Sequence, residues 1–205
     1  TDFRDGCKLT PRSVAKETMY YTDVGEPYKV WSPIVNPTIE RYVHVDMGLT
    51  NDAAGISICH IAGNVKRSKT STDRDNFGEI VDYELPYFWV DLMLRILPPG
   101  GGEQIRFSDI KQIVMDFQRL GFKFRAASAD GYQSANLLQD FSDMGMETAV
   151  VSMDRTIEPY SLLRDLFNED RISIYDYEVV LGELFNLERG VKAGMRNGKR
   201  VRIEW

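Results

Sequence analysis

The alternation of hydrophobic and polar positions predicts strands in the first half of the chain. Residues 42–47 and 54–62 are short, largely apolar segments separated by a polar turn, a pattern typical of two adjacent strands. The polar and basic segment 66–76 is predicted to be an exposed hairpin tip or loop. Residues 79–97 begin as a strand and continue as an apolar run that resembles a helix, which two prolines and three glycines end.

From residue 107 onward, amphipathic segments with a helical period alternate with short apolar segments. Glycine follows the first two helical segments at Gly121 and Gly145, where a helix commonly ends. We therefore predict an α/β fold, with a mixed central sheet flanked by helices. The predicted helices cover 107–120, 134–144, 158–168 and 177–189, and the predicted strands cover 122–130, 146–153, 171–175 and 200–205.

A length of 205 residues fits one α/β domain or two small domains. We interpret residues 1–40, which are rich in proline, as an N-terminal segment that wraps the domain, and residues 41–205 as the domain itself. No apolar run approaches the roughly 20 residues that a membrane helix needs, so no membrane partner is expected. Cys7 and Cys59 lie too far apart to indicate a disulfide framework or a zinc site, which favours the cytoplasm.

The positive charge of the chain is concentrated in two places. A net charge of −6 argues against a protein that coats nucleic acid through a general positive field. The two basic clusters are either solvated loop charges or a groove for a DNA phosphate backbone. The candidate DNA-binding residues are Lys66, Arg67, Lys69 and Arg74 in the first cluster, and Lys192, Arg196, Lys199 and Arg200 in the second.

Two aspartates, Asp46 and Asp130, each stand at the carboxyl end of a predicted apolar strand. Ligands of open α/β sheets bind at the carboxyl ends of strands, so the two carboxylates converge if their strands are neighbours. Paired carboxylates are typical ligands of Mg²⁺ or Mn²⁺. The alternative is that each aspartate caps the turn that follows it. Asp52 is either a turn residue or a residue that supports the metal ligands indirectly.

The remaining candidate chemistry is sparse. The sequence contains no phosphate-binding loop of the GxxxxGK[ST] type, and no GxSxG, HExxH or CxxC motif. His44 and His60 alternate with apolar neighbours, a pattern typical of structural histidines, so we leave both out of the predicted site.

Segments 44–63, 124–147 and 171–188 together resemble the nuclease domain of the large terminase subunit of tailed bacteriophages, a member of the RNase H-like superfamily. The block Asp130-Gly131-Tyr132-Gln133-Ser134 and the helix after it carry most of this resemblance, which covers roughly residues 40–205. The resemblance implies an RNase H-like fold with a mixed five-stranded sheet. It also implies a metal-dependent endonuclease that cuts double-stranded, concatemeric DNA with little sequence preference.

In that family, acidic residues bind two divalent ions, Mg²⁺ or Mn²⁺, that hydrolyse a phosphodiester. By resemblance, Asp46 and Asp130 are catalytic residues and metal ligands. The expected partners are double-stranded DNA, the terminase ATPase domain, the small terminase subunit and the portal, in the cytoplasm of the infected bacterium. We expect the isolated domain to be monomeric.

The sequence departs from the family pattern in three respects. The third carboxylate of the family lies on a C-terminal helix after the last strand, which this sequence lacks, so the third ligand is unassigned. The wide separation of Asp46 and Asp130 is assigned to an insertion around residues 87–105. The ATPase half is absent, which suggests a fragment.

Two other functions stay open at this point. One is a DNA-binding or docking module of the terminase motor without activity, since only two of three ligands are identified. The other is a phosphate-binding domain, because residues 46–50 also resemble the DxGxT turn of actin-like proteins and sugar kinases.

Overall fold

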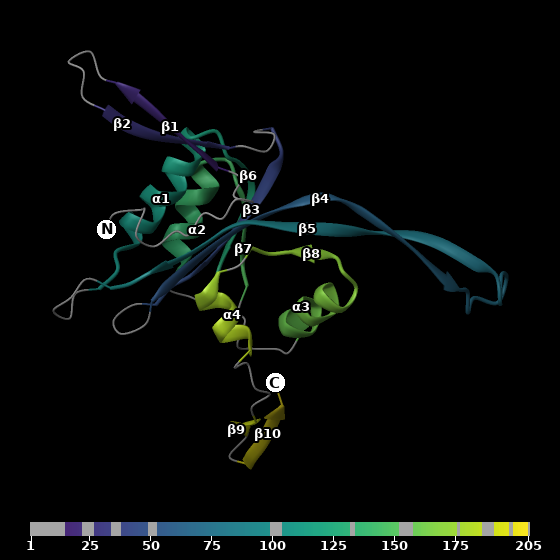
Figure 1. Cartoon of the computed structure of the whole chain (residues 1–205). Helices are drawn as coiled ribbons and strands as arrows, with labels where there is room; N and C mark the ends of the chain where they lie inside the picture. The colour runs from purple at the N-terminus through teal and green to yellow at the C-terminus, as the bar shows by residue number, and fades with distance from the viewer. Residues whose placement is uncertain are drawn as a thin grey trace.

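Figure 1 shows a computed structural model of the whole chain. The structure describes residues 38–48, 53–98, 104–131, 134–151, 158–175 and 177–185 with their side chains. It also describes the backbone of four further strands, β1 (Ala15–Tyr21), β2 (Pro27–Pro33), β9 (Val191–Arg196) and β10 (Lys199–Glu204).

A mixed sheet forms the centre of the described chain and has the strand order β7-β6-β3-β4-β5-β8. Its strands are β3 (Glu40–Asp46), β4 (Ala54–Thr70), β5 (Ile80–Ile96), β6 (Lys123–Ala129), β7 (Glu147–Val150) and β8 (Ile172–Ser173). Strand β4 runs antiparallel to β3 and β5, whereas the β3–β6, β6–β7 and β5–β8 pairs are parallel. The mixed sheet predicted from the sequence is therefore confirmed. It has six strands, not five, because the two-residue strand β8 adds to the β5 edge.

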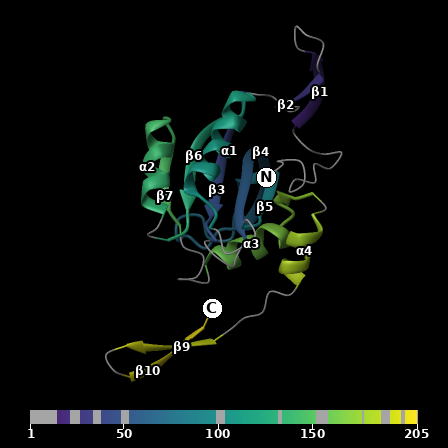
Figure 2. The same cartoon turned by 90° about the vertical axis from the view of Figure 1, so that its left-hand side faces the viewer.

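Two helices, α1 (Phe107–Arg119) and α2 (Ala135–Asp143), cover one face of this sheet (Figure 2). Alternate residues of the strands point toward them, as the burial pattern of β3 shows. The core on this side is formed by Val43, Val45, Ile56, Ile58, Leu92, Leu94, Ala127 and Ala129 of the sheet with Ile110, Val114, Phe117, Leu137, Leu138 and Phe141 of the helices.

The segment that contains α3 (Glu158–Asn168), β8 and α4 (Glu178–Phe185) is attached to strand β5. The hydroxyl group of Tyr175 accepts a hydrogen bond from the Met93 N–H (2.6 Å) and donates one to the Met93 carbonyl oxygen (3.1 Å). These bonds fix the chain just before α4, which lies against the sheet face opposite α1 and α2 (Figure 2). Among the described helices, none has the length and hydrophobicity needed to cross a membrane.

Strand β5 corrects the prediction for residues 79–97, which we expected to become helical. Residues Ile80–Ile96 form one strand that pairs with β4 along its length. From Leu85 to Leu94, side chains on both faces of β5 are at least half-buried, so its apolar positions are consecutive and do not alternate. A continuous apolar run cannot be assigned to strand or helix by its period alone.

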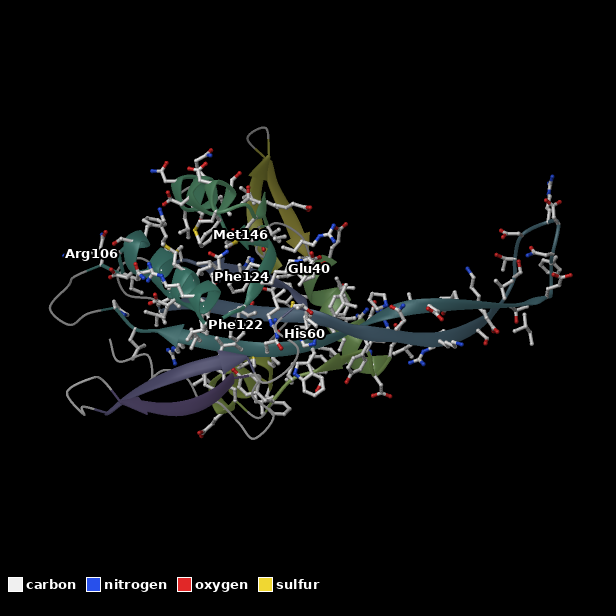
Figure 3. All side chains as sticks on the ribbon, turned by 90° about the horizontal axis from the view of Figure 1, so that it is seen from above. Glu40, His60, Arg106, Phe122, Phe124 and Met146 are labelled. Atoms are coloured by element: carbon white, nitrogen blue, oxygen red, sulfur yellow. The ribbon has the colours of Figure 1, made fainter. Side chains whose placement is uncertain are left out.

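The outer parts of β4 and β5 form a long two-stranded extension, residues 61–87, which we call the arm. In this hairpin, Gly63 pairs with Tyr87 and Thr70 pairs with Ile80. Figures 1 and 3 show the arm projecting from the body of the protein. The hairpin predicted for residues 66–76 is thus part of a longer structure. The assignment of an insertion to residues 87–105 is wrong, because residues up to Ile96 belong to β5 and the extra length lies in the arm.

A buried cluster of charged side chains lies at the base of the arm. Arg41 Nε is 3.1 Å from an Asp91 carboxylate oxygen, and His60 Nδ1 is 2.8 Å from the other. The exposed fractions of Arg41, Asp91 and His60 are 0%, 1% and 3%. The β4–β5 register shifts between Ile58 and Cys59, and Asp91 is the extra residue at this bulge, which turns its side chain into the core.

An aromatic ring completes this cluster. The Arg41 guanidinium lies 4.8 Å from the centre of the Phe122 ring, and Figure 3 shows Phe122 and His60 near the point where the arm leaves the body. Burial raises the pKa of Asp91, while His60 and Arg41 act in the opposite direction. The contacts of Arg41 and His60 with the Asp91 carboxylate and the cation–π contact compensate part of the cost of burying these charges.

Two hairpins lie outside the central sheet. Strands β1 and β2 pair only with each other, and so do β9 and β10, within the described residues. The predicted C-terminal strand is observed as β10, whereas β9 was not predicted. The interpretation of residues 1–40 as a segment that wraps the domain stays a prediction.

Candidate metal and DNA site

Strands β3 and β6 bring Asp46 and Asp130 to the same edge of the sheet. The two strands are parallel, with Val45 paired to Ala129, and the Asp130 N–H donates a hydrogen bond to the Val45 carbonyl oxygen (3.2 Å). Asp46 is the last residue of β3, and Asp130 directly follows β6. The two carboxylates therefore leave neighbouring strand ends on the same face, as the sequence analysis expected.

The chain around Asp130 is fixed by a tight turn between β6 and α2. Gly131 has φ +73°, a left-handed conformation that glycine adopts without the strain imposed by a side chain. The Ser134 hydroxyl donates to the Asp130 carbonyl oxygen (2.5 Å). The hydrogen bonds of Asp130 with Ser134 and Val45 both use its backbone, so they leave its carboxylate available to a ligand.

Neither carboxylate has a hydrogen-bond or ion-pair partner among the side chains and backbone groups that the structure describes. Asp46 is exposed and Asp130 is half-buried. A capping aspartate would accept a hydrogen bond from a backbone N–H two or three residues later. The N–H groups two and three residues after Asp130, and three residues after Asp46, lie outside the described residues, so the capping interpretation stays open. Asp52 also lies outside the described residues.

A pocket of about 440 Å³ adjoins Asp46. Its floor is formed by β3, β4 and β5, and its wall is formed by α4 and the residue before it. Asp130 is not among its lining residues, so Asp46 stands between the pocket and Asp130. The lining residues are His44, Asp46, Ala53, Ala54, Gly55, Ile56, Ser57, Met93, Leu94, Arg95, Tyr177, Val179, Val180 and Glu183.

Two of these lining residues, His44 and Glu183, were missed by the sequence analysis. His44 precedes Asp46 by two positions on the same strand, and a hydrogen bond of 2.9 Å joins its Nδ1 to the Ser128 hydroxyl. Burial lowers the pKa of His44, although Asp46 and Asp130 act to raise it. The alternation with apolar residues predicted that both histidines are structural, and each has a hydrogen-bond partner, Ser128 for His44 and Asp91 for His60. The position of His44 in the pocket lining was not predicted.

Glu183 adds a third carboxylate to the surroundings of Asp46. It extends from α4, which reaches the pocket because Tyr175 fixes the preceding chain to β5. Within the described residues, no group of three or more histidine, cysteine, aspartate or glutamate side chains is close enough together to hold a metal ion. Asp46 and Asp130 are neighbours through the β3–β6 pairing, and Glu183 lines the pocket from α4.

Cys59, the cysteine in the described part of the chain, does not line this pocket. Cys59 is a free thiol on β4, and burial raises its pKa to about 11. The thiol is thus protonated near neutral pH and is a poor nucleophile.

The basic residues of the first cluster lie on the arm, but not on one surface. Lys66, Arg67 and Lys69 belong to β4, and successive residues of a strand point to opposite faces. Lys66 is therefore on one face of the arm, and Arg67 and Lys69 are on the other. The Lys69 ammonium lies 5.8 Å from the centre of the Tyr83 ring, and Arg74 is exposed in the turn at the tip.

Arg67 has a structural partner that the sequence did not indicate. Its Nη2 donates to the Glu169 carbonyl oxygen (2.5 Å), while Arg171 binds the Glu169 carboxylate (2.6 Å) and the Pro86 carbonyl oxygen (3.3 Å). These bonds join the base of the arm to the chain that links α3 and β8. Arg67 thus differs from its exposed neighbour Lys66.

We expect Arg67→Ala to loosen the α3–β8 segment, because it removes a charged hydrogen bond worth about 1.5–3 kcal/mol. Amide hydrogen exchange across residues 158–173 should become faster, whereas Lys66→Ala should leave it unchanged. Equal exchange rates in the two variants would show that Arg67 does not hold this segment.

The second basic cluster lies on the hairpin of β9 and β10. Lys199 pairs with Arg196, Arg200 pairs with Met195, and Lys192 pairs with Ile203. The side chains of this hairpin are outside the described structure, so these candidates are placed only by backbone register. Their contact with DNA stays a prediction.

A solved structure resembles this fold. The large terminase nuclease from thermophilic phage G20c covers 83% of this chain and 75% of its own, with a TM-score of 0.53 and 13% sequence identity. The HK97 bacteriophage large terminase covers 67% of this chain and 30% of its own, with a TM-score of 0.37 and 14% identity. This TM-score is too low for the likeness to support a conclusion about the fold. No family model and no curated protein sequence matches the chain.

The likeness to the G20c nuclease concerns the fold. It confirms the predicted fold class, a mixed central sheet flanked by helices, which this chain shares with that nuclease structure. At 13% identity it does not transfer an activity or a set of site residues.

Proposed function

We propose that this chain is a divalent-metal-dependent endonuclease domain of a viral DNA-packaging terminase. One observation carries the proposal. Asp46 and Asp130, without partners among the described residues, leave the ends of two neighbouring parallel strands in a fold that is shared with a terminase nuclease. Two adjacent carboxylates repel each other unless a proton or a cation lies between them, and oxygen-rich pairs of this kind favour Mg²⁺ or Mn²⁺.

In this proposal, Asp46 and Asp130 hold the metal ions, two of which are expected. When bound, the ions neutralise phosphate charge and activate the attacking water. The protein contributes position: the β3–β6 pairing fixes the spacing of the two carboxylates, and the turn at Gly131 fixes the Asp130 backbone. Glu183 is our candidate for the third carboxylate, reaching the metal when α4 moves closer to Asp46.

The proposed substrate is double-stranded, concatemeric DNA, cut with little sequence preference. A phosphate backbone is recognised through cationic side chains, and the arm and the β9–β10 hairpin carry the candidates named above. The proposed partners are a terminase ATPase domain, a small terminase subunit and a portal, in the cytoplasm of an infected bacterium. We propose that the isolated domain is monomeric.

Cleavage of supercoiled plasmid tests this function. We expect nicked and linear products in Mg²⁺ or Mn²⁺ and none in EDTA, with activity restored when the metal is returned in excess. Products of unchanged yield in EDTA would contradict a metal-dependent nuclease. Heat-denatured protein provides the control for contaminating nucleases.

A second candidate function is a DNA-binding module without activity. It is favoured by the absence, in the described residues, of a complete three-carboxylate cluster. Folded protein that binds a DNA duplex but cuts no plasmid in either metal would favour this module over the nuclease.

A further inference from the structure

An arginine lies across the pocket from the proposed metal ligand Asp46. Arg95 on β5 pairs with Gly55 on β4, and Gly55 pairs with Asp46 on β3. Directly paired residues point to the same face of a sheet. Arg95 and Asp46 therefore share one face, about 10 Å apart at two strand spacings.

Gly55 leaves the space between these two side chains open. It has no side chain, and a Cβ atom built there would lie 3.9 Å from the Cβ of Asp46. Any larger residue would extend into the space that separates Arg95 from Asp46. All three residues line the pocket described above.

The charge of Arg95 is not neutralised within the described residues. Its side chain is exposed and has no hydrogen bond or ion pair there, whereas many other arginines have an anionic or carbonyl partner. Those arginines are Arg41, Arg67, Arg119, Arg125, Arg164 and Arg171.

Among the described residues that line the pocket, Arg95 is the one that is a lysine or an arginine. Asp46 and Glu183 contribute carboxylates to the same lining. A polyanion that enters this pocket is repelled by both carboxylates. The Arg95 guanidinium, on the β5 side of the pocket floor, attracts a polyanion.

We propose that Arg95 binds a backbone phosphate of the DNA strand that lies in this pocket. The proposal rests on the proposed function, since it places the reacting phosphate at Asp46 and Asp130. The planar guanidinium donates two parallel hydrogen bonds to a phosphate, which fixes both distance and orientation. Arg95 is therefore a positioning residue, and the basic arm residues are not the primary contact near the site of cleavage.

The test compares Arg95→Gln and Arg95→Lys with the control Arg106→Gln. Arg106 is also an exposed arginine without a side-chain partner among the described residues, but it lies at the start of α1 and does not line the pocket. Binding of a fluorescent duplex is measured over a salt series in Ca²⁺, with gel electrophoresis to verify that the duplex stays intact. Plasmid cleavage in Mg²⁺ is measured in parallel.

We expect Arg95→Gln to weaken duplex binding about tenfold, as loss of a charged hydrogen bond does. The slope of log affinity against log salt should decrease by about 0.9, the value for one phosphate contact. Arg95→Lys should keep the salt slope of the unmodified protein but recover only part of its duplex affinity. Lysine retains the positive charge but lacks the planar guanidinium that donates two parallel hydrogen bonds. Arg106→Gln should match the unmodified protein.

The outcomes separate this inference from the proposed function. Unchanged affinity and salt slope in Arg95→Gln would overturn the role of Arg95, even if the unmodified protein cuts plasmid. Weaker binding and a smaller slope in Arg95→Gln would support it, even if the unmodified protein cuts nothing. An equal loss in Arg106→Gln would assign the effect to net charge and would overturn the inference.

Discussion

Replacing either Asp46 or Asp130 with asparagine should reduce plasmid cleavage at least about 100-fold, the scale of loss when one group that stabilises a charged transition state is removed. Asparagine keeps the shape of the side chain but removes the negative charge that holds a divalent ion. Cleavage rates in Mg²⁺ and Mn²⁺ measure the effect.

The fold should tolerate both substitutions. Neither carboxylate has a partner among the described residues, and surface substitutions of this kind usually change stability by less than about 0.5 kcal/mol. Thermal unfolding checks this expectation. The matched control is Asp143→Asn at the exposed end of α2, which should cut plasmid at the rate of the unmodified protein.

Glu183→Gln extends the same experiment to the proposed third ligand. Its activity should also fall, and partial recovery at high metal concentration would identify a loss of metal affinity. Full activity of Glu183→Gln would exclude Glu183 as a ligand without affecting the roles of the two aspartates. Full activity of both aspartate variants would contradict the site itself.

The largest effect on stability is expected at the buried cluster. Asp91→Ala should lower the free energy of unfolding by about 3–5 kcal/mol, because it leaves the fully buried Arg41 guanidinium without its counter-charge. His60 also loses its hydrogen-bond partner. Urea unfolding, with the slope against urea concentration checked for two-state behaviour, measures the change.

A double variant distinguishes the buried charge from simple loss of volume. Arg41→Met combined with Asp91→Leu removes both charges and fills the space with apolar atoms, so it should be more stable than Asp91→Ala alone. If Asp91→Ala changed the unfolding free energy by less than about 1 kcal/mol, the cluster would not be an important element of stability.

Several features of this protein follow from the sequence because they depend on neighbouring residues. The apolar segments 42–47 and 54–62, separated by a polar turn, indicated two adjacent strands, which are observed as β3 and β4. The aspartates at the ends of β3 and β6 were recognised for the same reason. Period and turn preferences act over a few residues and do not require knowledge of the rest of the fold.

Other features were decided only by tertiary contacts. Strand β5 lacks a strand period because both of its faces are covered from Leu85 to Leu94, and Asp91 enters the core because of a bulge in its pairing with β4. Glu183 and Arg95 lie in the pocket of Asp46 because α4 is fixed to β5 and because β5 is two strands from β3.

The same distinction separates Arg67 from Lys66, which are adjacent in the sequence and chemically alike. Strand alternation sends them to opposite faces of the arm, and the chain after α3 meets only the face of Arg67. The sequence alone therefore determined strands β3, β4 and β6, the helices and the two strand-end carboxylates. The tertiary structure decided which distant charges meet that pair, because pairing and packing between remote segments leave no local period to read.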